Sequence, residues 1–319
     1  MASTASAGLA AGDDDDDAST FRGDGDRPAG DDYEQESVIG KGAFGLVTLM
    51  RCKESEQLVA MKTIDRFRLT TIHLKKAVAR EIEILKTVVP RHEGIVPLLQ
   101  LIETPRSIHM VMEYASGGTL FDCLAVRGGG ALGEARARRL AAQLVAAVAH
   151  LHAHRVCHRD LKLENCVLDD DGDRGRHAAA SGGGGERVRL IDFGLSYRWA
   201  EGEQQKPLTK LAGSLHYMAP EMLARTGYLG AHIDAWSLGV ILAAMLTGRL
   251  LFRADTEKAL KAAVLAGTYE LPDRRTDPPV SEQSADLVRG FLTLDPQTRL
   301  SVADARGHEW LRGEMGHAE

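Results

Sequence analysis

The chain has 319 residues, of which 44% are hydrophobic and 26% charged, so it can bury a sizeable core and is neither a disordered nor a fibrous protein. Its net charge of −6 is uneven, because nine Asp and two Arg give residues 1–32 a charge of −7 and leave the rest of the chain at +1. A nearly neutral body carries no electrostatic footprint for nucleic acid, and the acidic segment would repel anionic lipid, so we expect neither as a partner.

Cysteine usage and apolar runs indicate the compartment. The four cysteines have no CxxC or metal-ligand spacing and are too few to crosslink a chain of this length. We expect reduced thiols and a cytoplasmic or nuclear protein. The longest apolar runs, such as residues 238–246, are shorter than a membrane-spanning helix, and no signal-peptide pattern is found, so no membrane insertion is expected.

The first part of the chain is predicted to be rich in strands. Residues 1–32 hold one aromatic side chain, Phe21, among many Gly, Ala and Asp, and are expected to form a disordered acidic tail. Apolar periodicity predicts a helix over residues 74–88. Runs of strand-forming residues predict strands at 37–39, 46–50, 58–61, 96–102 and 108–114.

The part that follows Gly117 and Gly118 is predicted to be mainly helical. Residues 169–187, which include a run of four glycines, are expected to be a flexible insertion in a hairpin. A strand-rich front and a helix-rich back predict an α+β fold with two unequal lobes and a cleft, at residues 33–114 and 115–312, followed by a short tail at 313–319. Helices are expected at 120–126, 134–154, 236–246, 257–265 and 282–292.

The first candidate site is a glycine-rich segment with the pattern GxGxxGxV. Glycines lack a Cβ, so backbone N–H groups there can approach phosphate oxygens. A dinucleotide-binding fold would need a helix after the third glycine, whereas a strand-like Leu-Val-Thr-Leu run follows here. Taken alone, the pattern fits an ordinary glycine-rich hairpin equally well. The residues are Gly40, Lys41, Gly42, Ala43, Phe44, Gly45, Leu46 and Val47.

A lysine and a glutamate follow in an order that suits phosphate binding. Lys62 ends the apolar run Val-Ala-Met and could hold the α- and β-phosphates of a nucleotide. Glu81 lies in the predicted helix and could pair with Lys62, so that the position of the helix would control the assembly of the site. Either residue alone is more often a solvated surface charge.

Residues 158–165, with the sequence HRDLKLEN, are the most informative motif. The chain here resembles the eukaryotic protein kinases, whose HRDLKxxN motif this octapeptide matches. The resemblance implies the two-lobed kinase fold, ATP as phosphoryl donor, and Asp160 as the acceptor of the substrate hydroxyl proton. It further implies Mg²⁺ ligands at Asn165 and at Asp192, the aspartate of a DFG motif. Lys162 has the identity typical of serine/threonine kinases and could neutralise charge on the transferring phosphoryl group.

The resemblance extends over residues 37–311 and assigns further positions. Glu221 of an APE motif would pair with Arg299, and Asp234 would brace the HRD backbone. His158 would be a packing residue. Met112 would gate an adenine pocket walled by Val47, Ala60, Leu120 and Val167, with the backbone of Glu113 and Ala115 hydrogen-bonded to the base.

The sequence favours serine and threonine as acceptor residues. It also resembles the calcium/calmodulin-dependent and AMP-activated kinase group. Ser214 is expected to contact Asp160 and Lys162. Glu164 could recognise a substrate Arg or Lys, although Thr119 replaces a glutamate that the group often has after the hinge glycines. Only eight residues follow Leu311, so activity is expected to be independent of calcium.

Regulation is predicted from Arg159 and the segment before the APE motif. In the family, an arginine at the position of Arg159 docks a phosphate of the activation segment. The usual phosphothreonine position, three residues before Gly213, holds Lys210, and Thr209 precedes it. We expect an upstream kinase to phosphorylate Thr209, with an unmodified loop residue as the alternative.

Three functions remain open at this stage. The first is an active serine/threonine kinase that acts on protein substrates, and the second is a nucleotide-binding pseudokinase that acts as a scaffold. The third is a small-molecule kinase, which the intact segment from Gly213 to Glu221 disfavours. Lys62, Asp160 and Asp192 are all present, and this favours the first.

Overall fold

The computed structural model describes residues 32–41, 45–88, 92–126, 130–169, 186–200, 207–271 and 279–313. The tail at residues 1–31, the insertion at 170–185 and the segment 314–319 lie outside the described residues. Two compact units are present, unit 1 with residues 1–79 and 99–112, and unit 2 with residues 80–98 and 113–319. Residues 80–98 belong to unit 2 because Ile84 and Ile95 are buried in its core. The predicted domain limits stay predictions.

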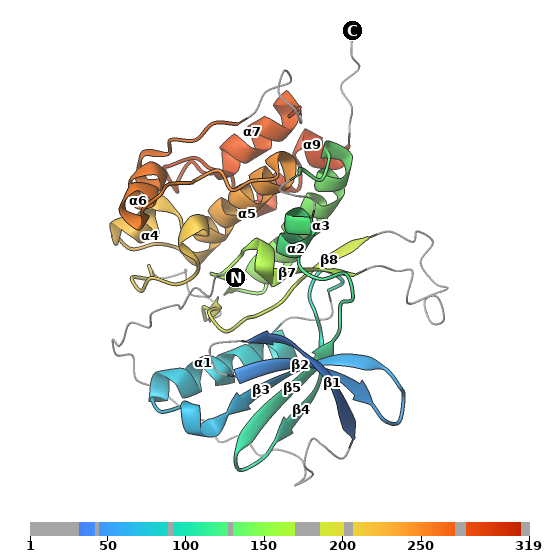
Figure 1. The fold of residues 1–319 in the computed structure, drawn as a ribbon. Helices are drawn as coiled ribbons and strands as arrows, with labels where there is room; N and C mark the ends of the chain where they lie inside the picture. The colour runs from blue at the N-terminus through green and yellow to red at the C-terminus, as the bar shows by residue number, and fades with distance from the viewer. Residues whose placement is uncertain are drawn as a thin grey trace. The chain divides into compact units, whose positions relative to one another are not determined.

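Unit 1 is built on a five-stranded sheet in the order β1-β2-β3-β5-β4 (Figure 1). Antiparallel ladders join β1 to β2 and β2 to β3. All five strands lie where the sequence predicts them, but β4 begins two residues later than expected. Val96, which the sequence placed in this strand, belongs to unit 2, where its N–H donates to Leu190 O at 3.1 Å. The strands are β1 (Tyr33–Lys41), β2 (Gly45–Cys52), β3 (Leu58–Asp65), β4 (Leu98–Glu103) and β5 (Ser107–Glu113).

The two faces of this sheet have different roles. Side chains alternate between the faces of a strand, and Met50 lies opposite Val59 on the face that carries a hydrophobic core. Val47 lies opposite Lys62, so these two side chains share the other face with Ala60. The sequence period therefore brings the predicted adenine and phosphate contacts of unit 1 to one face.

The predicted helix at residues 74–88 is α1 (Ile72–Glu83), which continues as a π-helical turn, η2 (Ile84–Val88). Thr71 caps the start of α1. Its Oγ1 accepts the N–H of Leu74 at 3.3 Å and so satisfies one of the free donors of the first turn. A short 3₁₀ turn, η1 (Arg66–Arg68), precedes the helix.

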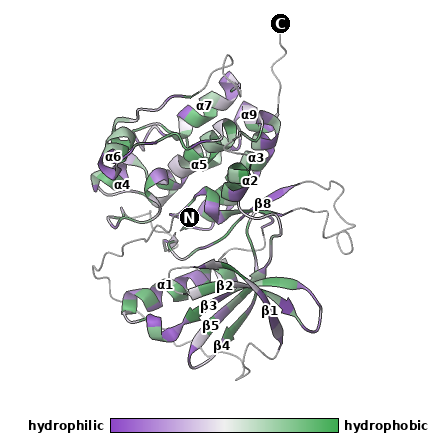
Figure 2. Ribbon diagram, in the orientation of Figure 1, coloured by the Kyte–Doolittle hydropathy of each residue, from purple (hydrophilic) through white to green (hydrophobic). Residues whose placement is uncertain are grey.

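Unit 2 is organised around α5 (Gly230–Thr247), which packs against α3 and α7 (Figure 1). Figure 2 shows the hydropathy along these helices. In the described part of the chain, α5 is the one helix long and apolar enough to cross a membrane, but most of it is buried inside the protein. The other helices are α2 (Leu120–Val126), α3 (Glu134–Ala153), α4 (Pro220–Ala224), α6 (Glu257–Ala266), α7 (Glu282–Phe291), α8 (Val302–Ala305) and α9 (Glu309–Arg312).

The HRD and DFG motifs lie on short strands and turns of unit 2. β6 (Val156–Cys157) pairs with β9 (Tyr197–Arg198), and β7 (Cys166–Asp169) pairs with β8 (Arg187–Leu190). Between β6 and β7 the chain forms η3 (Leu163–Asn165), and η5 (Leu215–Tyr217) precedes α4. Short ladders thus hold both sides of the HRD and DFG segments.

Candidate active site

The HRD segment is held by a buried carboxylate of α5. Asp234 is 1% exposed, and its two oxygens accept the N–H groups of His158 and Arg159, each at 2.9 Å. His152 Nε2 lies 2.8 Å from the same carboxylate. Arg159 has a φ of 67°, a left-handed conformation that costs free energy unless the surroundings hold it. The brace that the resemblance implies is present, and it fixes a strained residue beside Asp160.

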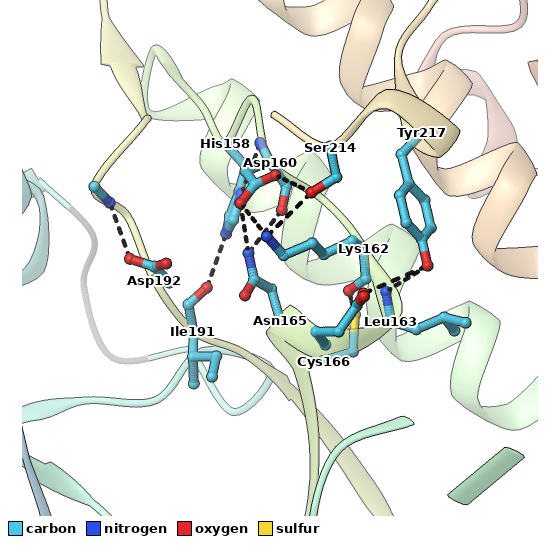
Figure 3. Close-up of polar contacts among 12 residues, drawn as sticks. His158, Asp160, Lys162, Leu163, Asn165, Cys166, Ile191, Asp192, Ser214 and Tyr217 are labelled. Carbon is cyan, nitrogen blue, oxygen red and sulfur yellow. Dashed lines mark hydrogen bonds and ion pairs between the residues drawn. The ribbon is translucent and has the colours of Figure 1, made fainter. Parts of the chain in front are cut away.

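Three donors surround Asp160 (Figure 3). Its Oδ2 accepts from Lys162 Nζ at 2.7 Å and from Asn165 Nδ2 at 3.1 Å. Its Oδ1 accepts only a longer bond, from Ser214 Oγ at 3.4 Å. Lys162 Nζ also donates to Ser214 Oγ at 3.2 Å, so the contacts predicted for Ser214 are both present. Oδ1 is therefore the oxygen best placed to exchange a weak bond for one from an incoming hydroxyl.

Asn165 and Asp192 offer oxygen atoms suited to a hard cation. Asn165 turns Nδ2 toward Asp160, with a further bond to the Asp160 carbonyl at 2.8 Å, so Oδ1 is the atom that could ligate a metal. Asp192 is exposed and has a φ of 65°. The described residues contain no cluster of three or more His, Cys, Asp or Glu that could hold a metal, so Mg²⁺ would need further oxygens, as when it binds nucleotide phosphates.

Two contacts join the DFG segment to the HRD segment. The N–H of Ile191 donates to Asn165 O at 3.0 Å, and His158 Nε2 lies 3.1 Å from Ile191 O (Figure 3). The rings of His158 and Phe193 are 5.1 Å apart, and the side chain of His158 is fully buried. His158 thus packs and orients, and a substrate proton could not reach it.

Two buried tyrosines that sequence reasoning missed support these segments. The Tyr217 hydroxyl accepts the N–H of Leu163 and donates to Glu164 Oε2, both at 3.4 Å. Burial raises the pKa of Tyr217, so the hydroxyl stays a donor at neutral pH. The Tyr228 hydroxyl accepts from Arg159 Nη2 at 3.1 Å. Tyr217 lies in the segment from Gly213 to Glu221, which the sequence analysis used only as a sign of protein acceptors. Tyr228 lies outside every motif, so the sequence carried no local signal for its role.

Further along, Glu221 and Arg299 form a bidentate ion pair. Nη1 donates to Oε1 at 2.7 Å and Nη2 donates to Oε2 at 2.9 Å. Both side chains are buried, and the guanidinium also donates to the carbonyls of Thr293, Leu294 and His232. The pair predicted from the sequence is therefore structural and anchors the end of the segment that contains Ser214.

In unit 1 the two described glycines of the phosphate-binding pattern differ. A Cβ on Gly45 would lie 1.7 Å from Thr63 O, so only glycine fits between β2 and β3. A Cβ on Gly40 would lie 3.6 Å from Val47 Cβ, an ordinary contact. Lys41 is exposed and Lys62 is 7% exposed. Gly42, Ala43 and Phe44 lie outside the described residues.

In unit 2, Glu81 lies beside the DFG segment. Its side chain is 1% exposed, and a Cβ on Gly194 would lie 3.5 Å from Glu81 Oε2 and 3.3 Å from Asp192 Oδ1. Glu81 thus shares its surroundings with the predicted metal ligand. Because Lys62 belongs to unit 1, the pairing of Lys62 with Glu81 stays a prediction.

The predicted adenine contacts lie on two segments. The N–H of Glu113 donates to Pro97 O at 3.3 Å, and its carboxylate accepts from Arg189. Val167 forms a bridge with Thr119. Ala115 is half-buried and Leu120 is buried, while Met112 ends the part of β5 that belongs to unit 1.

Comparison with known protein families matches residues 33–311 to the protein kinase domain. The chain is 34% identical over 282 residues to serine/threonine-protein kinase SIK2 of Gallus gallus, covering 88% of this chain and 32% of that protein. It is 37% identical over 280 residues to the serine/threonine-protein kinase SIK3 homolog of Danio rerio, covering 88% and 21%. It is 36% identical over 289 residues to CBL-interacting serine/threonine-protein kinase 13 of Arabidopsis thaliana, covering 91% and 53%. The chain therefore spans between 21% and 53% of the length of these relatives.

Proposed function

The chain belongs to the protein kinase family, and we propose that it transfers the γ-phosphoryl group of ATP to serine and threonine hydroxyls of proteins. The observation that carries the proposal is the environment of Asp160. Its carboxylate is 7% exposed, is held on one oxygen by Lys162 and Asn165, and has the other oxygen next to Ser214. A carboxylate fixed in this way can orient a hydroxyl group and accept its proton.

The reaction follows from these positions. The acceptor hydroxyl donates to Asp160 Oδ1, and the hydroxyl oxygen forms a bond to the γ-phosphorus. The bond between that phosphorus and the β–γ bridging oxygen breaks, and ADP leaves. The hydroxyl proton passes to Asp160. Lys162, 2.7 Å from Asp160, supplies positive charge next to the transferred group. Mg²⁺ held by Asn165 and Asp192 would neutralise phosphate charge when it is bound. Catalysis here is mainly positioning and charge stabilisation.

The substrate is proposed to carry a basic residue near the acceptor hydroxyl. Glu164 is exposed, and its carboxylate is oriented by Tyr217 at 3.4 Å. An oriented, exposed carboxylate suits an arginine or lysine of a peptide. Thr119 bonds Asp122 Oδ2 at 2.6 Å, so this position caps α2 instead of offering a second carboxylate.

Phosphorylation of Thr209 by an upstream kinase is also proposed. Its side chain is exposed and lies in the segment that precedes Ser214, where a modifying enzyme can reach it. Peptide mass analysis of the active enzyme as isolated from its native cells tests this, and the absence of phosphate on Thr209 in that preparation would refute it. Activity in a calcium chelator and a cytoplasmic or nuclear location stay predictions.

The proposed activity is tested by transfer of label from [γ-³²P]ATP and Mg²⁺ to a degenerate library of Ser, Thr and Tyr peptides. We expect label on Ser and Thr, and enrichment of peptides with Arg or Lys near the acceptor. Label confined to Tyr, or to small-molecule alcohols, would contradict the proposal. Loss of the basic preference in Glu164→Gln would assign that preference to Glu164, and Glu282→Gln, on an exposed glutamate of α7, is the control.

A further inference from the structure

We infer that Tyr228 is a positioning residue that holds residues 208–214 on the catalytic loop through its hydroxyl group, so that this segment is positioned without a phosphate on it. The inference rests on the proposed kinase activity, because the segment it positions contains Ser214. It adds a residue that lies outside the HRD, DFG and APE motifs.

The contacts of Tyr228 reach both the segment and the HRD arginine. Its backbone exchanges two hydrogen bonds with Leu208, with the Leu208 N–H donating at 2.8 Å and the Tyr228 N–H donating at 2.9 Å. Its hydroxyl donates to Lys210 O and accepts from Arg159 Nη2 at 3.1 Å. Arg159 also lies over the ring, with Cζ 5.9 Å from the centroid. One phenol therefore joins the backbone of Lys210 to the guanidinium of Arg159.

The other end of the segment rests on the same loop. Gly213 has a φ of 93°, and a Cβ there would lie 2.8 Å from Arg159 O. Ser214 follows and contacts Lys162 and Asp160. Since Tyr228 lies just before α5, whose Asp234 binds the backbone N–H of Arg159 at 2.9 Å, one stretch of chain holds Arg159 at its backbone and at its side chain.

The charges around Arg159 explain why a neutral hydroxyl is needed there. Burial and then the positive charge of Arg159 lower the pKa of Arg80, so each of the two cations is disfavoured by the charge of the other. The phenol gives Arg159 an acceptor, and since burial raises the pKa of Tyr228 against the opposing effect of Arg159, the hydroxyl keeps the proton that it donates to Lys210 O. A side chain with one donor and one acceptor meets both demands at once.

Tyr228→Phe tests the inference, because it removes the hydroxyl and keeps the ring. We expect KM for a peptide substrate to rise about tenfold, the loss expected for a hydrogen bond to a charged group, with KM for ATP within about twofold and the melting temperature nearly unchanged. Tyr269→Phe is the matched control, because Tyr269 is a half-buried phenol packed edge-on against Phe252, away from the HRD loop. It should leave both KM values unchanged.

The requirement for a phosphate is tested with phosphatase-treated enzyme and with Thr209→Ala. Both should keep most of the wild-type activity when Tyr228 is present, and both should lose it in the Tyr228→Phe background. A peptide KM that Tyr228→Phe leaves unchanged, equal rises in both KM values with a lower melting temperature, or an inactive dephosphorylated wild type would each overturn the inference. Failure of the phosphorylated wild type to transfer label at all would instead refute the proposed function.

Discussion

The pair of Glu221 with Arg299 shows how this protein stabilises charges that are buried away from water. The Arg299 side chain is 1% exposed and the Glu221 side chain 8% exposed, so neither charge can be stabilised by water. Trp236 packs against the guanidinium, with Arg299 Cζ 5.1 Å from the ring centroid. Such a pair adds little net stability, but losing one partner leaves a buried charge without compensation.

Glu221→Gln is therefore expected to lower the free energy of unfolding by about 2–4 kcal/mol, because Arg299 keeps its charge in a buried position. Urea unfolding measures the change. Glu282→Gln is the control, because it removes an exposed partner of Arg289 and should cost less than about 0.5 kcal/mol. Equal losses in the two variants would show that burial of the ion pair does not determine its contribution.

Sequence reasoning located the site residues that are close together in the chain and missed those that arrive from elsewhere. Asp160, Lys162 and Asn165 lie within six positions of one loop, so a motif suffices to group them. Tyr228 reaches Arg159 across 69 positions, and nothing in its neighbouring residues marks it. A tyrosine that packs and a tyrosine that positions a loop look alike until the fold brings their hydroxyls to a partner.

At the scale of elements, the β2–β3 ladder separates a structural glycine, Gly45, from Gly40, whose binding role is predicted. Gly45 lies where a Cβ would come within 1.7 Å of Thr63 O, and the nearest atom to a Cβ on Gly40 is 3.6 Å away. The first position is fixed by strand pairing. The second has room for a Cβ in the folded protein, so strand pairing does not require a glycine there. The absence of a side chain at this position suits the approach of a phosphate.

Gly45→Ala is expected to destabilise the protein by about 2 kcal/mol or more, since β2 and β3 must move apart. Gly40→Ala should leave stability nearly unchanged and raise KM for ATP several-fold. Thermal unfolding and ATP kinetics on the two variants give both values. If Gly40→Ala binds ATP as the wild type does, Gly40 takes no part in phosphate binding.

Periodicity predicted amphipathic elements well and a fully buried helix less well. The helix predicted at residues 236–246 begins at Gly230 in the structure, because its first turns include His232 and Asp234, which interrupt the apolar run. Asp234 is buried there because the HRD backbone donates to it. A helix that is buried on all sides shows no 3.6-residue pattern, so its start could not be read from the sequence.

At the scale of the whole molecule, half-buried histidines make stability depend on pH. Burial lowers the pKa of His92, His109 and His232, so each takes up a proton more readily in the unfolded chain. The unfolded chain then binds more protons as the pH falls below the usual histidine pKa of about 6.5. Stability is therefore present above that value and is lost as the pH decreases through the lowered pKa values of the folded state.

We expect the urea midpoint to fall steadily between pH 7 and pH 5 and to change little between pH 7 and pH 8. His109→Gln, which removes one half-buried histidine beside Thr63, should reduce this slope. His216→Gln, on an exposed side chain, is the control and should leave the slope as it is. A midpoint that rises toward pH 5 would contradict the sign derived from these histidines.

The most direct test of the whole account compares the wild type with Asp160→Asn, measuring ATP binding and label transfer on the same preparations. The account predicts equal ATP affinity, with transfer to Ser and Thr reduced at least about a hundredfold in the variant, because only proton acceptance and hydroxyl orientation are removed. Asp255→Asn, on an exposed loop aspartate, should transfer as the wild type does. A wild type that binds ATP and transfers nothing, or an Asp160→Asn variant as active as the wild type, would contradict the central claim.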